Sequence, residues 1–119
     1  MKIAITSLGK DLDSQIDPRF GRAAYILIVD LDGNEVEALD NSENLNAFKG
    51  AGIQAAAMLS KSDAEVLLTG YCGPNAFKTL QAAGIKVVND VSGTVKDAVD
   101  AFNVENAAYA DSANVEAHW

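Results

Sequence analysis

The first forty residues alternate short apolar runs with polar turns, a pattern typical of a β-meander. The β-branched run KIAITS predicts a strand at residues 2–7, and the more apolar AAYILIVD predicts a second strand at residues 23–30. Asp32-Gly33 is a hairpin signal. The alternating EVEALD at residues 35–40 predicts a return strand with one solvent-exposed face. We therefore expect three antiparallel strands at the start of the chain.

After a polar linker, apolar runs of helical and strand length alternate. They predict a helix ending near Ser60, a strand at residues 65–69, a helix from Pro74 to Ala83, a strand at residues 85–88 and a helix at residues 95–102. The order β-β-β-α-β-α-β-α predicts an α/β fold with a mixed five-stranded sheet and helices on its faces. We expect one domain at residues 1–102 and a loosely packed C-terminal tail at residues 103–119.

Composition narrows the class of protein. About half of the 119 residues are apolar, enough for a core, but no run approaches the roughly 18 to 20 apolar residues that span a membrane. The single cysteine cannot form an internal disulfide, which fits a reducing compartment, so we expect a cytoplasmic protein. We also expect a monomer. The net charge of −8 repels phosphate backbones and disfavours nucleic-acid binding.

The two arginines of this acidic chain stand three residues apart, at Arg19 and Arg22. They lie in the irregular segment 8–22, called here the arginine loop. Two neighbouring surface charges would explain the pair, and so would an anion-binding site. Because the loop shows no hydrophobic period and the two cations repel each other, we expect it to be mobile until an anion binds.

In a sheet of this kind, ligands bind outside the carboxyl ends of the strands. The arginine loop, the turn at residues 49–52 and the turn at residues 70–75 should meet there. The second and third of these segments open helices, whose N-termini offer free backbone N–H groups to anions. Glycines at positions 50, 52, 70 and 73 would let backbone approach a ligand closely.

Cys72 lies at a predicted helix start, where a lowered pKa would favour the thiolate, a soft metal ligand; a small buried residue is the alternative. Tyr71, Phe20 and Phe77 could shield an inorganic cluster or simply pack in the core. Asp17 could pair with an arginine. His118, beside the terminal Trp119, could bind a metal or belong to a disordered tail.

The sequence lacks the residues that a serine-triad enzyme, a nucleotide-binding enzyme or a two-metal nuclease would need. His118 is the only candidate base for a serine triad, and the glycines form neither a P-loop nor a dinucleotide fingerprint. A two-metal nuclease needs convergent carboxylates, whereas the first strand ends in Thr6 and Ser7. We therefore expect a binding protein, not an enzyme.

Three segments together carry a family resemblance: SLGKDLDS at residues 7–14, DPRFGRA at 17–23 and GYCGPNAF at 70–77. Over about residues 1–102 the chain resembles the dinitrogenase iron-molybdenum cofactor biosynthesis family, most of all its branch from sulfate-reducing bacteria. The resemblance implies a ribonuclease-H-like three-layer fold and binding without turnover. It implies an anionic molybdenum-copper sulfide cluster, held non-covalently; an iron-molybdenum cofactor precursor is the alternative cargo.

The resemblance also suggests P-loop ATPases or cluster-acceptor proteins as partners. Many nitrogenase-associated members carry histidine at the position of Arg19, and arginine, which has no lone pair to donate, suits charge pairing instead of ligation. The expected cluster-binding residues are Arg19, Phe20, Gly21, Arg22, Gly50, Gly52, Gly70, Tyr71, Cys72, Gly73 and Asn75, with Cys72 the candidate metal ligand. A regulatory protein-binding module without a cofactor is the competing function.

Overall fold

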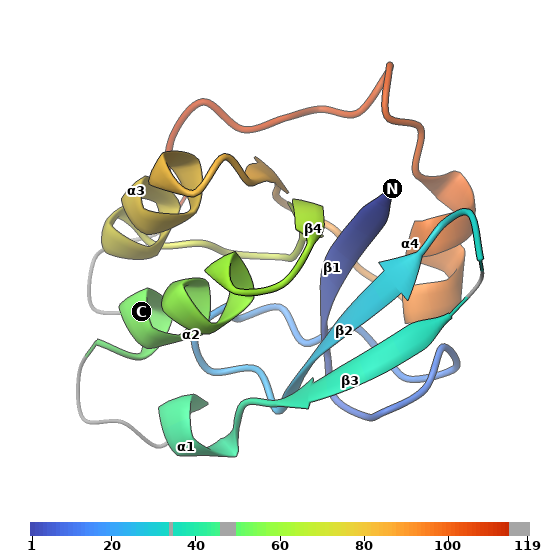
Figure 1. The fold of residues 1–119 in the computed structure, drawn as a ribbon, viewed down its shortest axis with the longest axis horizontal. Helices are drawn as coiled ribbons and strands as arrows, with labels where there is room; N and C mark the ends of the chain where they lie inside the picture. The colour runs from blue at the N-terminus through green and yellow to red at the C-terminus, as the bar shows by residue number, and fades with distance from the viewer. Residues whose placement is uncertain (34, 46–49, 115–119) are drawn as a thin grey trace.

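The computed structural model describes residues 1–33, 35–45 and 50–114. A mixed five-stranded sheet forms its centre, in the order β3-β2-β1-β4-β5 (Figure 1). The strands are β1 (Lys2–Ser7), β2 (Tyr25–Asp30), β3 (Val36–Asp40), β4 (Ala64–Leu68) and β5 (Lys86–Val88). The helices are α1 (Ser42–Leu45), α2 (Ala51–Ser60), α3 (Pro74–Ala82) and α4 (Val95–Ala101).

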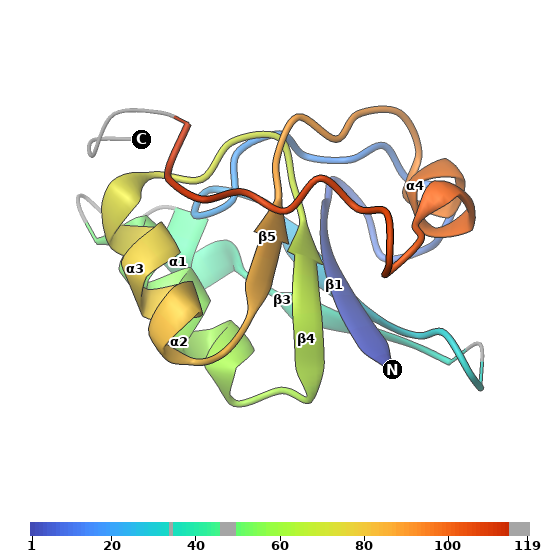
Figure 2. The same ribbon diagram turned by 90° about the horizontal axis from the view of Figure 1, so that it is seen from above.

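Helices cover both faces of the sheet, which gives three layers (Figures 1 and 2). Helices α2 and α3 pack on one face over a core that includes Ile26, Leu59 and Leu80. Helix α4 packs on the other face, where Ile5 and Val95 are fully buried. Because successive strand residues point to opposite faces, the unbroken apolar runs of β1, β2 and β4 supply both cores at once.

The strands and the three longer helices predicted from sequence are present, to within one or two residues at most ends. Gly84 has a positive φ of 78° just after α3, and Thr94 Oγ1 accepts a hydrogen bond from the Asp97 N–H at the start of α4. Both are the boundary signals that the sequence carries. The ribonuclease-H-like class of the fold stays a prediction.

Two features of the region after β2 differ from expectation. The segment read as a polar linker contains the short helix α1, so the predicted element order was incomplete. Strand β3 was expected to bury one face, but four of its five residues are exposed and only Leu39 is partly buried. The reason is its place at the end of the sheet, where the helices give it little cover.

Strand direction determines where the loops gather. Strands β1, β4 and β5 are parallel, and β3 runs the same way because it is antiparallel to β2, which is antiparallel to β1. Their carboxyl ends therefore share one edge of the sheet. The arginine loop, the segment leading to α2 and the turn leading to α3 all start from that edge, as the sequence predicted.

The segment after α4 returns along the outer edge of β5 (Figure 2). Tyr109 forms a β-bridge with Val88, and the Ala110 N–H donates to the Val87 carbonyl at 2.7 Å. Most residues from 103 to 114 are exposed, yet these hydrogen bonds tie the segment to the sheet. The domain boundary at residue 102 stays a prediction. None of the helices among the described residues is long and apolar enough to cross a bilayer.

Gly21 should be intolerant of any side chain. A Cβ there would lie 2.5 Å from the Gly52 nitrogen and 2.9 Å from the Ala51 carbonyl carbon, which are backbone atoms that cannot rotate away. We expect Gly21→Ala to lower the free energy of unfolding by about 1 to 3 kcal/mol, as overpacking does. Gly33→Ala is the matched control, because its nearest heavy atom, an Asp30 side-chain oxygen, is 3.4 Å away. Equal urea midpoints for the two variants would contradict this packing.

Candidate functional site

Backbone hydrogen bonds connect the arginine loop to the end of β1 and to the turn at residues 70–75. The Asp17 N–H donates to the Thr6 carbonyl at 3.1 Å. The Phe20 N–H donates to the Tyr71 carbonyl at 3.1 Å, and the Tyr71 N–H donates back to Pro18 at 2.6 Å. The expectation of a mobile loop overlooked these bonds and the burial of Phe20. They favour a loop that is already formed before any ligand binds.

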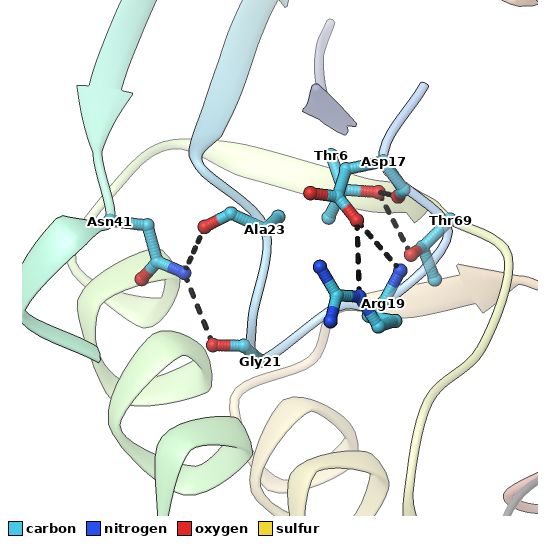
Figure 3. Close-up of polar contacts among 7 residues, drawn as sticks. All are labelled: Thr6, Asp17, Arg19, Gly21, Ala23, Asn41 and Thr69. Atoms are coloured by element: carbon cyan, nitrogen blue, oxygen red, sulfur yellow. Dashed lines mark hydrogen bonds and ion pairs between the residues drawn. The ribbon is translucent and has the colours of Figure 1, made fainter. Parts of the chain in front are cut away.

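Below the loop lies a small cluster of buried polar groups (Figure 3). The hydroxyls of Thr6 and Thr69 are 2.9 Å apart, and Thr6 Oγ1 donates to the Asp17 carbonyl at 2.6 Å. Both threonine side chains are fully buried. These hydrogen bonds join the ends of β1 and β4 to the loop, so the polar groups are satisfied where water cannot reach.

Asp17 orients Arg19, the pairing that the sequence suggested. The Asp17 carboxylate, only 2 % exposed, accepts the Arg19 backbone N–H at 3.1 Å and lies 3.8 Å from Arg19 Nε. Figure 3 shows both contacts, from the Arg19 backbone N–H and from Nε, converging on the Asp17 carboxylate. The Arg19 side chain is half exposed, so its terminal N–H donors remain within reach of a ligand. Arg22 is partly buried and has a partner within the chain.

Asn41 fixes the other end of the arginine loop, and sequence reasoning missed it (Figure 3). Its side-chain amide donates to the carbonyls of Gly21 at 3.2 Å and Ala23 at 2.8 Å, while its Oδ1 accepts from Asn44. Asn41 is fully buried. In the sequence it is one polar residue among several after β3, and nothing in that pattern marks a contact across 20 positions.

Close approaches at glycine bring the three predicted segments together. Gly21, between the two arginines, lies against the first turn of α2 at Gly52. Gly70 lies against Pro18, where a Cβ would be 2.8 Å from the proline backbone. The predicted convergence is therefore present. The sequence suggested that these glycines let backbone approach a ligand. Beside Gly52 and Gly70, however, the space is filled by the protein itself.

The helix starts at this edge lack side-chain caps. Gly50 and Gly73 are the N-cap residues of α2 and α3. Because glycine has no side chain, neither helix start has a side-chain capping hydrogen bond from its N-cap residue. Gly50 adopts a left-handed φ of 81°, and Asn75 is exposed in the first turn of α3. Backbone N–H groups in first turns are donors that an anion can satisfy. Anion binding by these N–H groups stays a prediction.

Of the two interpretations of Cys72, the structure supports the small buried residue and not the thiolate. The side chain is 1 % exposed and packs in the core, and burial raises the pKa of the thiol to about 12. Desolvation outweighs the helix N-terminus because it disfavours the charged form outright. The Cys72 backbone N–H donates to Asn114 Oδ1 at 2.9 Å, and Asn114 Nδ2 donates to Gly70 at 3.0 Å. Its position gives metal ligation by Cys72 no support.

The aromatic residues divide between the core and the surface. Phe20 and Phe77 are buried in the core against α2 and α3, so packing accounts for them. Tyr71 is 39 % exposed and forms a backbone bridge with Arg19. Of these three aromatic residues, Tyr71 is the one exposed enough to lie against a ligand beside the arginine.

The rest of the described chain offers no comparable site for a metal or an anion. Within residues 1–33, 35–45 and 50–114, no group of three histidine, cysteine, aspartate or glutamate side chains could hold a metal ion. Lys49, His118 and Trp119 lie outside the described residues. A cavity of about 450 Å³ between α4 and residues 102–107 has mainly apolar walls, with Asp97 on its rim, and does not suit an anion.

Removing the Asn41 amide should loosen the arginine loop. Asn41→Ala leaves two buried carbonyls without a donor, at a cost of about 1 to 3 kcal/mol. We expect faster amide hydrogen exchange at Phe20 and Ala23, with the central strands unchanged. Asn44→Ala, which removes only the contact to Asn41 Oδ1, is the control. Equally fast exchange in both variants would refute this role.

The buried thiol should make stability fall at alkaline pH. The folded protein holds the thiol proton from the ordinary pKa near 9 up to about 12, whereas the unfolded chain releases it. The contribution of the neutral thiol is complete below pH 9 and is lost as the pH rises through this window. We expect Cys72→Ala to show a smaller alkaline loss in thermal unfolding midpoint than the parent. Parallel pH profiles would contradict the shift.

Comparison with known proteins places this site in a family. The family model described as dinitrogenase iron-molybdenum cofactor matches residues 1–105. The apo form of the orange protein from Desulfovibrio gigas is 49 % identical, with a TM-score of 0.91 and 96 % of each chain covered. A structure from Thermotoga assigned to the DUF35 family is 40 % identical, with a TM-score of 0.75 and 88 % of each chain covered.

A curated relative from Methanocaldococcus jannaschii, an uncharacterized protein, is 21 % identical over 105 residues, covering 86 % of this chain and 89 % of its own. The family match spans the three strand-end segments that meet at the site. It also contains Asn41, which holds the arginine loop. The chain belongs to the dinitrogenase iron-molybdenum cofactor family.

Proposed function

We propose that this protein binds and carries an anionic molybdenum-containing metal-sulfide cluster, held without covalent bonds and without chemical turnover. One observation carries the proposal. The loop that holds both arginines packs, at Gly21, on the first turn of α2, and it is hydrogen-bonded at Phe20 to the turn that leads into α3. Positive charge and the N-terminal ends of two helices thus share one edge of an otherwise acidic protein.

Charge and shape, not ligation, would hold the cargo. The Arg19 guanidinium stays charged at any accessible pH and offers several N–H donors in a fixed plane. Its carboxylate partner Asp17 holds Nε and leaves the terminal nitrogens available to sulfide. The neutral, buried thiol of Cys72 supports a cluster that brings its own sulfide ligands.

The composition we favour is molybdenum-copper sulfide, which the resemblance to the branch from sulfate-reducing bacteria implies. The 49 % identity to the orange protein of Desulfovibrio gigas over nearly the whole chain supports membership of that branch. An iron-molybdenum cofactor precursor, suggested by the family description, is the alternative. We further propose a cytoplasmic monomer that delivers its cargo to a P-loop ATPase or another acceptor protein. Metal analysis of protein purified anaerobically from its natural host separates the two compositions.

Charge reversal of the arginines should abolish retention of the cluster. Tetrathiomolybdate, with and without copper(I), is the probe, and visible absorption after gel filtration measures retention. Each lost charge-assisted hydrogen bond to an arginine should weaken binding at least about tenfold. We expect Arg19→Glu with Arg22→Glu to lose the colour while its circular dichroism stays native.

The matched control is Lys61→Glu with Lys96→Glu, which makes the same change in net charge on exposed side chains elsewhere. This control should retain the cluster if position matters more than total charge. Undiminished molybdenum in the arginine variant would exclude the arginine loop as the binding site. A parent protein that retains neither probe would exclude the proposed cargo.

A further inference from the structure

Strand β3 leaves one side of the sheet open. It is the last strand in the order β3-β2-β1-β4-β5 and pairs only with β2. The N–H and C=O groups that point away from β2 make no hydrogen bond to the described residues. Four of its five side chains are exposed, including the apolar Val36 at 37 %. An edge of this kind can pair with another extended chain.

The segment that forms this edge is acidic, and the cations near it, Lys10 and the N-terminal amine, come from other segments and lie beside Tyr25 and Asp32. From Ala23 to Phe48 the chain carries six acidic residues and no lysine, arginine or histidine. Three of the acids serve the local fold. Asp30 accepts backbone N–H groups in the hairpin turn, Asp40 accepts the Ser42 N–H, and Asp32 pairs with the N-terminal amine.

Glu35 and Glu37 are different. Both are exposed, and neither side chain makes a hydrogen bond or ion pair with the described residues. Glu35 immediately precedes β3 and Glu37 is its second residue, so in extended backbone their side chains project to the same side. No local contact accounts for their charge, which lies at the start of the outermost strand.

We propose that the β3 edge is a docking site for an extended basic segment of another protein, which adds to the sheet as a further strand. Lysine or arginine at alternate positions of that segment would stand opposite Glu35 and Glu37. Opposite charges facing each other across strands stabilise the pairing, and like charges weaken it. A second copy of this chain is disfavoured for that reason, since it would bring its own acidic β3 to the contact.

The test uses the full-length protein labelled with ¹⁵N and a short peptide in which lysine alternates with valine. We expect amide shift changes along Val36–Asp40. Glu35→Gln with Glu37→Gln should lower the peptide affinity roughly three- to tenfold. Glu105→Gln with Asp111→Asn, the same charge change on exposed tail residues, should leave it unchanged.

Two further peptides separate strand addition from simple charge attraction. A peptide of the same sequence with alternate amides N-methylated cannot complete the strand pairing and should shift β3 at most weakly. Equal binding of the methylated peptide, or shifts spread over the acidic surface without a focus on β3, would overturn the proposal. Concentration-dependent self-association that Glu35→Lys strengthens would instead assign this edge to a second copy, and would also overturn it.

Discussion

The parallel pairing of β1 with β4 is the constraint on which this site depends. Parallel strands need long crossovers, and their carboxyl ends must lie side by side. In this chain the crossover from β1 to β4 takes in the β2–β3 hairpin and α2, so segments far apart in sequence return to one edge. The hydroxyl contact between Thr6 and Thr69 marks the position where the two strand ends meet.

The arginine loop crosses the carboxyl ends of the strands, where polar groups are buried. Its buried polar groups must therefore find hydrogen-bond partners within the protein. Asn41 supplies donors to two of its carbonyls, Thr6 binds the carbonyl of Asp17, and the Asp17 carboxylate holds the Arg19 backbone. Glycines remove side chains where two backbones touch, as at Gly21. The result is an arginine whose backbone is held in position by buried hydrogen bonds within the protein. Such pre-organisation lowers the entropy that a binding site loses when it takes a ligand.

Local signals in the sequence were sufficient for the five strands, the three longer helices and the convergence of the three loop segments. Strand alternation, the Asp32-Gly33 turn, and the Pro74 and Gly84 boundaries act within a few residues, so a short window reveals them. Helix α1 escaped because four residues cannot display a helical period.

The errors at the site share one cause. The pKa of the Cys72 thiol depends on burial, which local sequence does not report, and its backbone partner Asn114 lies 42 positions away. The contacts of Asn41 to Gly21 and Ala23 span 20 and 18 positions. Sequence patterns identify residue types suited to a role, whereas partners across such separations follow only from the folded chain.

The two borders of the sheet are unequal, and this limits the assemblies that the protein can build. Residues 109 and 110 already occupy the border at β5, where Tyr109 also lies under the Lys86 ammonium at 4.9 Å. Growth by strand addition is therefore possible at one border only. A molecule with a single such border ends any chain of associations at the first step, because an open filament needs two complementary surfaces on each subunit. Among the described residues, the segment after α4 thus leaves the sheet with a single open border, at β3.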